Sequence, residues 1–165
     1  PPEQPWPVPD PHPPAFRRAV IALNGGAGDP ALVRLVARAA HGSKTDQGTK
    51  PELVAVHVVE IDWTLPLDAD VAGRSEEAMR VLDVAEAAAE AAGVKLEPVL
   101  LQARDVGAAI VDEAAERDAD LLVLPLEYRT RFGGDFAIGR TVPYALKNAP
   151  MTVWVVREAM PEEAS

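Results

Sequence analysis

The chain has 165 residues, of which 48% are hydrophobic and 25% charged, proportions typical of one soluble globular domain. Acidic residues outnumber basic ones 26 to 16, so the chain lacks the basic face that nucleic-acid binding normally requires. The absence of cysteine excludes disulfides, thiolate catalysis and cysteine-ligated zinc. No apolar stretch approaches the roughly 20 residues of a membrane-spanning helix.

The N-terminal segment is rich in proline. Eight of the 16 prolines lie in the first 14 residues, which read PPEQPWPVPDPHPP. This composition favours an extended spacer, so we predict a linker over residues 1–15, a folded domain over 16–158 and a charged tail over 159–165. Because such spacers usually separate two folded parts, we expect the chain to be cut from a longer polypeptide, with N-terminal processing as the alternative.

The first predicted strand, residues 19–23, is a short apolar run that ends at a glycine-containing turn. A helix is predicted to follow, with Asp29 as its N-cap, Pro30 at the first helical position and Gly42 as its C-terminal stop. Its apolar positions recur at helical spacing and predict the buried face: Leu32, Leu35, Val36 and Ala39.

The rest of the chain continues the alternation of strands and helices. Further strands are predicted at residues 53–59, 95–102, 121–124 and 152–156. Further helices are predicted after the caps Ser75 and Asp105 and around residues 143–147, with loops at 43–50, 62–73 and 127–140. Strands that are apolar throughout are typical of a parallel sheet covered on both faces, so we predict a single-domain, three-layer α/β sandwich.

Ligands of such sheets bind at the carboxyl ends of the strands, where the strand order reverses, so two loops are of interest. The first contains Asn24, Gly25 and Gly26, whose backbone N–H groups could meet a phosphate; a plain tight turn is the alternative. The second, residues 127–140, carries three arginines, which either bind an anion or are solvated charges that balance an acidic domain.

Hydrolytic and metal sites are not supported by the sequence. Only three histidines exist, His12 in the linker, His41 at a helix end and His57 inside an apolar strand, where a hydrogen-bonded core histidine is the expected role. No nucleophile-elbow pattern accompanies them, and three scattered histidines cannot form a structural zinc site. We therefore predict neither catalysis nor a resident metal.

Four segments of the chain resemble the universal stress protein domain, and the likeness covers about residues 17–157. They are residues 19–24, the strand end Val-His-Val-Val-Glu at 56–60, the strand entry Ala-Asp-Leu-Leu-Val at 119–123, and Asn-Ala-Pro-Met-Thr-Val-Trp-Val-Val-Arg at 148–157. The resemblance implies a five-stranded parallel sheet of order 3-2-1-4-5 with four helices. It also implies a homodimer formed through the last strand, residues 152–156.

The same resemblance implies a degenerate nucleotide site. Family members that bind ATP have an aspartate at the end of strand one, a base-contacting valine and a G-x2-G-x9-G-(S/T) motif after strand four. The matching positions of this chain, with the neighbouring residues of the predicted cofactor site, are Asn24, Gly25, Gly26, Val58, Leu126, Arg129, Gly139, Arg140 and Thr141. Only Val58 and Gly139 are retained, so we expect ATP to bind weakly or not at all. AMP, a cyclic dinucleotide or another anion stays open as the ligand.

A narrower likeness concerns residues 102–106 and 131–144, which resemble universal stress domains appended to amino-acid permease-type transporters. It implies a non-catalytic regulatory domain in the cytoplasm, with the membrane part of the same chain as a partner. Two alternatives stay open: a free-standing universal stress protein that binds ATP or another adenine nucleotide in a variant mode, and a dimerisation module with an empty cleft.

Overall fold

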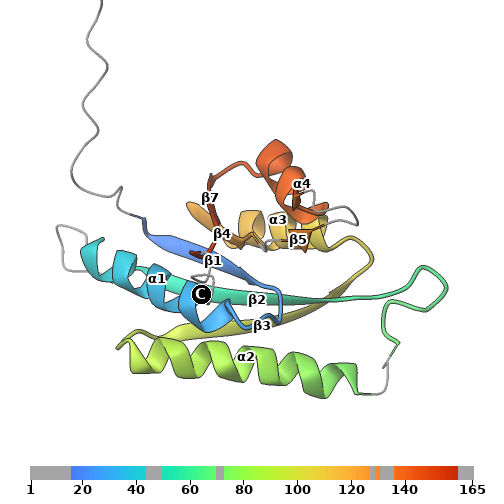
Figure 1. Cartoon of the computed structure of the whole chain (residues 1–165), viewed down its shortest axis with the longest axis horizontal. Coiled ribbons are helices and arrows are strands. Elements are labelled where there is room, and N and C mark those ends of the chain that lie inside the picture. Colours follow the sequence, from blue (N-terminus) through green and yellow to red (C-terminus); the bar gives the residue numbers. More distant parts are fainter. Residues whose placement is uncertain (1–15, 44–49, 70–72, 127–128, 131–135, 160–165) are drawn as a thin grey trace, which may run out of the picture.

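The structure of the chain, a computed structural model, describes residues 16–43, 50–69, 73–126, 129–130 and 136–159. The linker predicted for residues 1–15 and all but the first residue of the predicted tail lie outside this part. The main sheet is parallel and has the order β3-β2-β1-β4-β7 (Figure 1), which confirms the predicted topology. Its strands are β1 (Arg18–Leu23), β2 (Glu52–Glu60), β3 (Leu96–Ala103), β4 (Leu121–Pro125) and β7 (Thr152–Val156).

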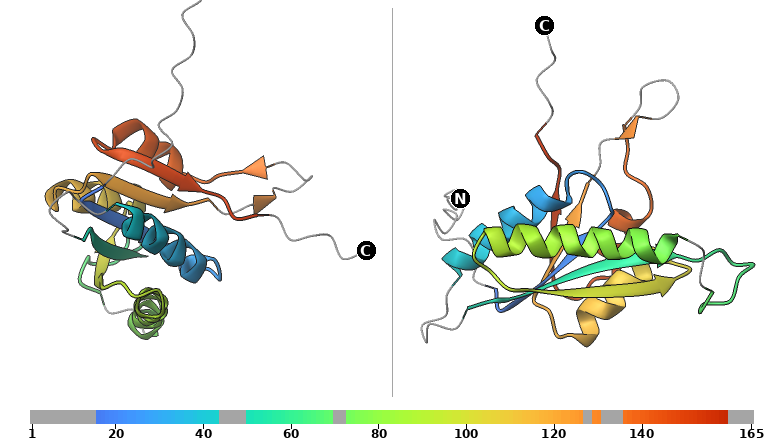
Figure 2. Two further views of the ribbon diagram at one scale, coloured as in Figure 1. Left: turned by 90° about the vertical axis from the view of Figure 1, so that its left-hand side faces the viewer. Right: turned by 90° about the horizontal axis from the view of Figure 1, so that it is seen from below.

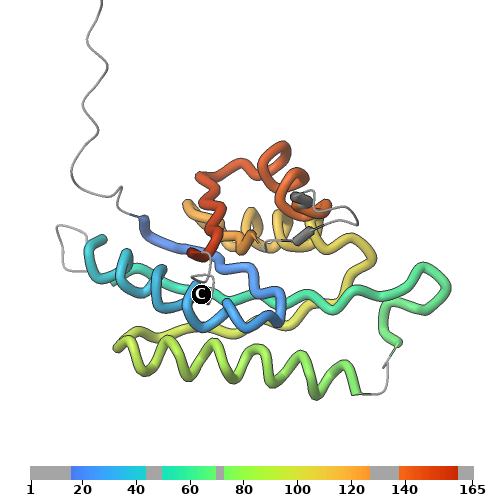
Figure 3. The backbone as a smooth tube through the Cα atoms, viewed as in Figure 1, coloured from blue at the N-terminus to red at the C-terminus, as the bar shows by residue number. Residues whose placement is uncertain are grey.

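Helices cover both faces of this sheet, as the apolar strands predicted. Figure 2 shows α1 (Asp29–Gly42) and α2 (Arg74–Ala91) on one face and α3 (Val106–Glu116) and α4 (Thr141–Asn148) on the other. The backbone trace in Figure 3 shows that the segment after β2 projects beyond the rest of the molecule. No helix in the described ranges is both long enough and apolar enough to cross a membrane.

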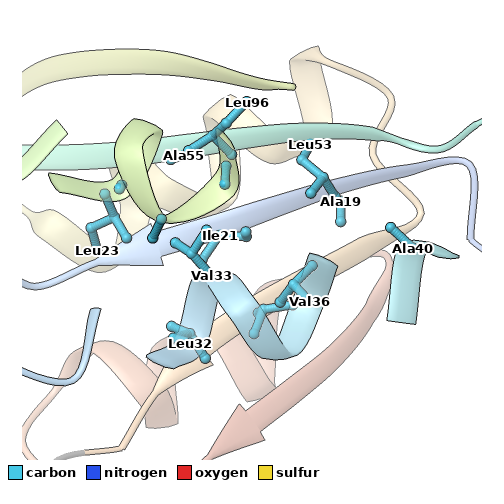
Figure 4. Close-up of a cluster of buried hydrophobic side chains, with 14 of the residues drawn as sticks. Ala19, Ile21, Leu23, Leu32, Val33, Val36, Ala40, Leu53, Ala55 and Leu96 are labelled. Carbon is cyan, nitrogen blue, oxygen red and sulfur yellow. The ribbon is translucent and has the colours of Figure 1, made fainter. Parts of the chain in front are cut away.

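The core consists of two layers separated by the sheet, because successive side chains of a strand point to opposite faces. Along β1, Ile21 and Leu23 join the cluster under α1 and α2, whereas Val20 and Ala22 join the cluster under α3 and α4. Figure 4 shows Ile21 next to Val33 of α1. Two buried layers on one central strand explain why the run over residues 19–23 is apolar throughout.

Two of the three predicted helix caps are wrong. The N-cap of α1 is Gly28, and Asp29 is the first helical residue, because its carboxylate accepts hydrogen bonds from the preceding loop instead. The helix α2 begins at Arg74 after Gly73, so Ser75 lies inside it. The third cap is confirmed, since the Asp105 carboxylate accepts a hydrogen bond of 3.1 Å from the N–H of Ala108.

The segment predicted as a continuous loop over residues 127–140 contains two short antiparallel strands, β5 (Arg129–Thr130) and β6 (Phe136–Ala137). Strands of two residues are too short to leave a periodic pattern in the sequence, so the prediction missed them. The last helix starts at Thr141, two residues earlier than predicted. Leu35, predicted to face the core, is 42% exposed on α1.

Candidate functional site

A cavity of about 330 Å³ lies between the loop that follows β1 and the side of α2. This loop leaves the carboxyl end of β1, the edge of a parallel sheet at which ligands bind. The residues that line the cavity come from the loop, the first turn of α1 and one face of α2: Gly25, Gly26, Asp29, Glu77, Arg80, Val81 and Val84.

Internal hydrogen bonds shape the loop wall of this cavity. Gly25 adopts a positive φ of 79°, a conformation that L side chains rarely adopt. The side-chain oxygen of Asn24 accepts a hydrogen bond of 2.8 Å from the N–H of Gly26, which closes a tight turn. The sequence therefore places asparagine and glycine where this turn requires them.

The buried carboxylate of Asp29 completes the loop. Asp29 is only 2% exposed. Its carboxylate accepts hydrogen bonds from the N–H groups of Gly25, at 2.9 Å, and Asn24, at 3.3 Å. The three loop N–H groups that the sequence offered to a phosphate thus already have acceptors inside the loop. An anionic ligand at this cavity must find its donors elsewhere.

The α2 wall supplies the only basic side chain among the described residues that line the cavity. Arg80 is exposed, and within the described ranges no carboxylate pairs with its guanidinium. Glu77 lies one turn before it, and Val81 and Val84 add apolar surface. The wall therefore combines a cation, a carboxylate and an apolar strip.

The structure places the site residues predicted from sequence in three regions. Gly25 and Gly26 line the cavity, and Asn24 shapes its loop. Val58 is buried in the core layer under α3 and α4, and Leu126 packs against the same layer while its N–H bonds the carbonyl of Val156.

Three of the four remaining predicted positions lie near the start of α4. Gly139 is exposed with a φ of 66°, Arg140 is the exposed N-cap, and Thr141 is the half-buried first helical residue. The backbone of Arg129 belongs to β5, and its side chain lies outside what the structure describes.

Sequence reasoning missed the α2 side of the cavity. The four residues are spaced for one helical face, at positions 77, 80, 81 and 84, and the two valines add apolar side chains to a mostly polar helix surface. That spacing was the available signal, but nothing in the sequence shows that this face turns toward the loop after β1.

The two histidines in the described part have hydrogen-bond partners. Nδ1 of His57 lies 3.1 Å from the carbonyl oxygen of Leu23, and Nε2 of His41 lies 3.0 Å from that of Ala92. The hydrogen bond predicted for the histidine within β2 is confirmed, but His57 is half-buried and not a core residue. His12 lies outside the described residues.

The chain matches known proteins in family and in fold. The model of the Universal stress protein family matches residues 15–157. Among curated proteins, none matches the chain. Among solved structures, 52 chains match, and they include the following three, each solved with an adenine nucleotide.

The first of the three is a universal stress protein in complex with cAMP (TM-score 0.65, 18% identity, 88% of this chain and 100% of that one). The second is the universal stress protein from Archaeoglobus fulgidus in complex with dAMP (TM-score 0.64, 19% identity, 86% and 98%). The third is a family protein from Arabidopsis thaliana with AMP bound (TM-score 0.60, 15% identity, 90% and 97%). At these identities the likeness shows a shared fold.

Proposed function

We propose that this chain, which belongs to the universal stress protein family, is a non-catalytic regulatory domain that binds an adenine mononucleotide in the cavity between the β1–α1 loop and α2. Three proteins of the same fold were solved with cAMP, dAMP or AMP. The observation that carries the proposal for this chain is Arg80, which lines a cavity beside the loop after β1 and has no carboxylate partner among the described residues.

The side chains of the cavity suit the three parts of a nucleoside monophosphate. The Arg80 guanidinium can pair with a phosphate through two hydrogen bonds, and the Glu77 carboxylate can accept from ribose hydroxyls. Val81 and Val84 offer apolar surface to a base. The volume, about 330 Å³, lies near the lower end of the roughly 300–1,000 Å³ typical of ligand sites, which favours a mononucleotide over a cyclic dinucleotide.

The charge of the cavity favours one phosphate over three. Arg80 shares the lining with the carboxylates of Glu77 and Asp29, and the N–H groups of the loop are engaged. Further phosphates would add negative charge with no further cation in the described lining. This agrees with the loss of two motif glycines at Leu126 and Arg129, which also argues against the ATP mode of the family.

Calorimetry tests this proposal. We expect AMP to bind at least about tenfold more tightly than ATP. Arg80→Ala should lower the affinity for AMP by about tenfold or more, because a charge-assisted hydrogen bond contributes about 1.5–3 kcal/mol. The matched control is Arg38→Ala, which removes an exposed arginine of α1 that does not line the cavity. Arg129→Ala and Arg140→Ala test the rival site near α4.

Three results would contradict the proposal. They are an Arg80→Ala variant that binds AMP as the wild type does, tight ATP binding, and losses confined to the Arg129→Ala and Arg140→Ala variants. The last result would place the ligand at the loop after β4. Cyclic di-AMP serves as the size control, and we expect no measurable binding of it.

The setting of the domain is a separate part of the proposal. We propose that it lies in the cytoplasm and follows the membrane part of a permease-type transporter in the same chain. This rests on the resemblance of residues 102–106 and 131–144 to universal stress domains appended to such transporters. A free-standing universal stress protein is supported equally by the family match and by the cavity. The reading frame upstream of Pro1 distinguishes the two, because a transporter would encode repeated apolar segments of about 20 residues there.

We also propose a homodimer through β7. Among the described residues this strand pairs with β4 alone, and so along one edge. Its apolar residues Val153, Trp154, Val155 and Val156 are half-buried. An apolar edge strand invites pairing with another chain unless it is covered, and a two-fold partner strand would cover it.

A further inference from the structure

His57 lies beside the cavity, on the face of the sheet that α1 and α2 cover. Side chains alternate along β2, and Leu53 and Ala55, on the same side as His57, belong to the core cluster under these helices. A side-chain carbon added at Gly25 would lie 3.8 Å from Cε1 of His57 and 3.4 Å from Cγ2 of Val81. Because Gly25 and Val81 both line the cavity, the imidazole lies directly behind this part of its lining.

One ring nitrogen of His57 is engaged and the other is open. Nδ1 lies 3.1 Å from the carbonyl oxygen of Leu23. Since a carbonyl oxygen only accepts, Nδ1 carries the hydrogen of this bond, and Nε2 is the nitrogen that takes up a proton in acid. In the part of the chain that the structure describes, every buried side-chain nitrogen or oxygen has a hydrogen-bond partner, and Nε2 has none there. It therefore reaches solvent, and the ring can gain a proton in the folded chain.

The charged groups around this ring come from the two helices packed on its face of the sheet. Glu77 and Arg80 of α2 and the buried Asp29 of α1 line the cavity. The neighbours of His57 on the adjacent strands, Leu23 and Leu100, carry no charge, and the loop after β1 carries none before Asp29. Arg80 is the only cation of the lining that the structure describes, so protonation of His57 would bring a second positive charge to the cavity.

We propose that His57 makes anion binding in this cavity depend on pH, because its protonated ring attracts the phosphate of a bound nucleotide. This inference rests on the nucleotide site proposed above and adds its regulation. Since the ligand favours the protonated ring, binding should tighten as the pH falls through the histidine range, from about pH 8 to about pH 5.5. The chain has no cysteine, so histidine is the side chain that changes charge in this range.

The first measurement needs no nucleotide. In the ¹⁵N-labelled chain, the amide shift of Gly25 should titrate between about pH 8 and about pH 5.5, because a charge appears on the ring next to it. The titration should vanish in His57→Gln. It should persist in the matched control His41→Gln, which removes the imidazole near the C-terminal end of α1 that bonds the carbonyl of Ala92. A Gly25 shift that ignores pH in the wild type, or still titrates in His57→Gln, would overturn the inference whatever AMP does.

The second measurement is calorimetry with AMP at the same two pH values. The ratio of the affinity at about pH 5.5 to that at about pH 8 should be about threefold or more larger in the wild type than in His57→Gln, as expected for one added charge near the phosphate. Comparing the two chains removes the effect of AMP's own phosphate, which titrates near pH 6. His41→Gln should behave as the wild type does.

The outcomes separate this inference from the proposed function. Equal ratios in the wild type and His57→Gln would overturn the inference and leave the nucleotide site standing. Absence of AMP binding at both pH values would overturn the nucleotide site and, with it, the inference. Melting temperatures at pH 8 verify that the variants are folded, and His57→Asn, which also cannot gain a charge, repeats the comparison if the glutamine variant does not fold.

Discussion

Replacing Ile21 with alanine should lower the free energy of unfolding by about 2–5 kcal/mol, because the lost methyl and methylene groups leave a cavity that neighbours fill only in part. Ile21 is fully buried on the central strand β1, beneath α1 (Figure 4). Urea unfolding followed by circular dichroism measures the change. The urea concentration at the midpoint of unfolding should fall, while the slope of the free energy of unfolding against urea concentration stays the same.

The control for this prediction is Leu35→Ala on the helix that covers Ile21. Leu35 is 42% exposed, so its truncation removes much less buried surface. It should lower the free energy of unfolding by well under half as much as Ile21→Ala does. Equal losses in the two variants would contradict the placement of Ile21 in the core.

Replacing Val155 with lysine should weaken the proposed dimer by about a hundredfold or more. The two-fold axis would bring the introduced ammonium groups of both chains to one interface, and an unpaired charge that loses water there costs several kcal/mol. Val153→Lys should act in the same direction. Sedimentation velocity over a concentration series measures the effect, with the wild type expected to be dimeric at high micromolar concentration.

Leu146→Lys is the matched control, because Leu146 is an exposed leucine of α4 and not part of β7. It introduces the same charge and should leave the dimer intact. A monomeric wild type at high micromolar concentration would contradict the dimer. Dissociation by Leu146→Lys alone would indicate that the dimer interface lies at α4 and not at β7.

The fold was predictable because its signals are local and repeated. Four strands of the main sheet are largely apolar runs between glycine-rich or polar segments, whereas the edge strand β3 contains Glu97 and Gln102 and alternates exposed with half-buried positions. Asp105 is a cap whose helix follows directly. The cap predicted at Ser75 is wrong because α2 already begins at Arg74, and the cap predicted at Asp29 is wrong because its carboxylate accepts other hydrogen bonds. Asp29 found its partners in the preceding loop, which no local pattern reveals.

The site was predictable only on its loop side. Asn24, Gly25 and Gly26 were identified because glycine directly after a buried strand indicates a tight turn of the backbone. Arg80 belongs to a helix with many charges, and its position beside that loop depends on how α2 packs across the sheet. The exposure of Leu35 has the same origin, since helical spacing gives the period of a buried face and not its width.

The most direct test of the central claim is a titration of the ¹⁵N-labelled chain with AMP, followed by amide chemical shifts. We predict that the largest shifts belong to Gly25, Gly26 and Val81, which line the cavity, and that Gly93 beyond the end of α2 stays unchanged. Shifts centred on Gly139, Arg140 and Thr141 with Val81 unmoved, or no shifts at millimolar AMP, would contradict a nucleotide site between the β1–α1 loop and α2.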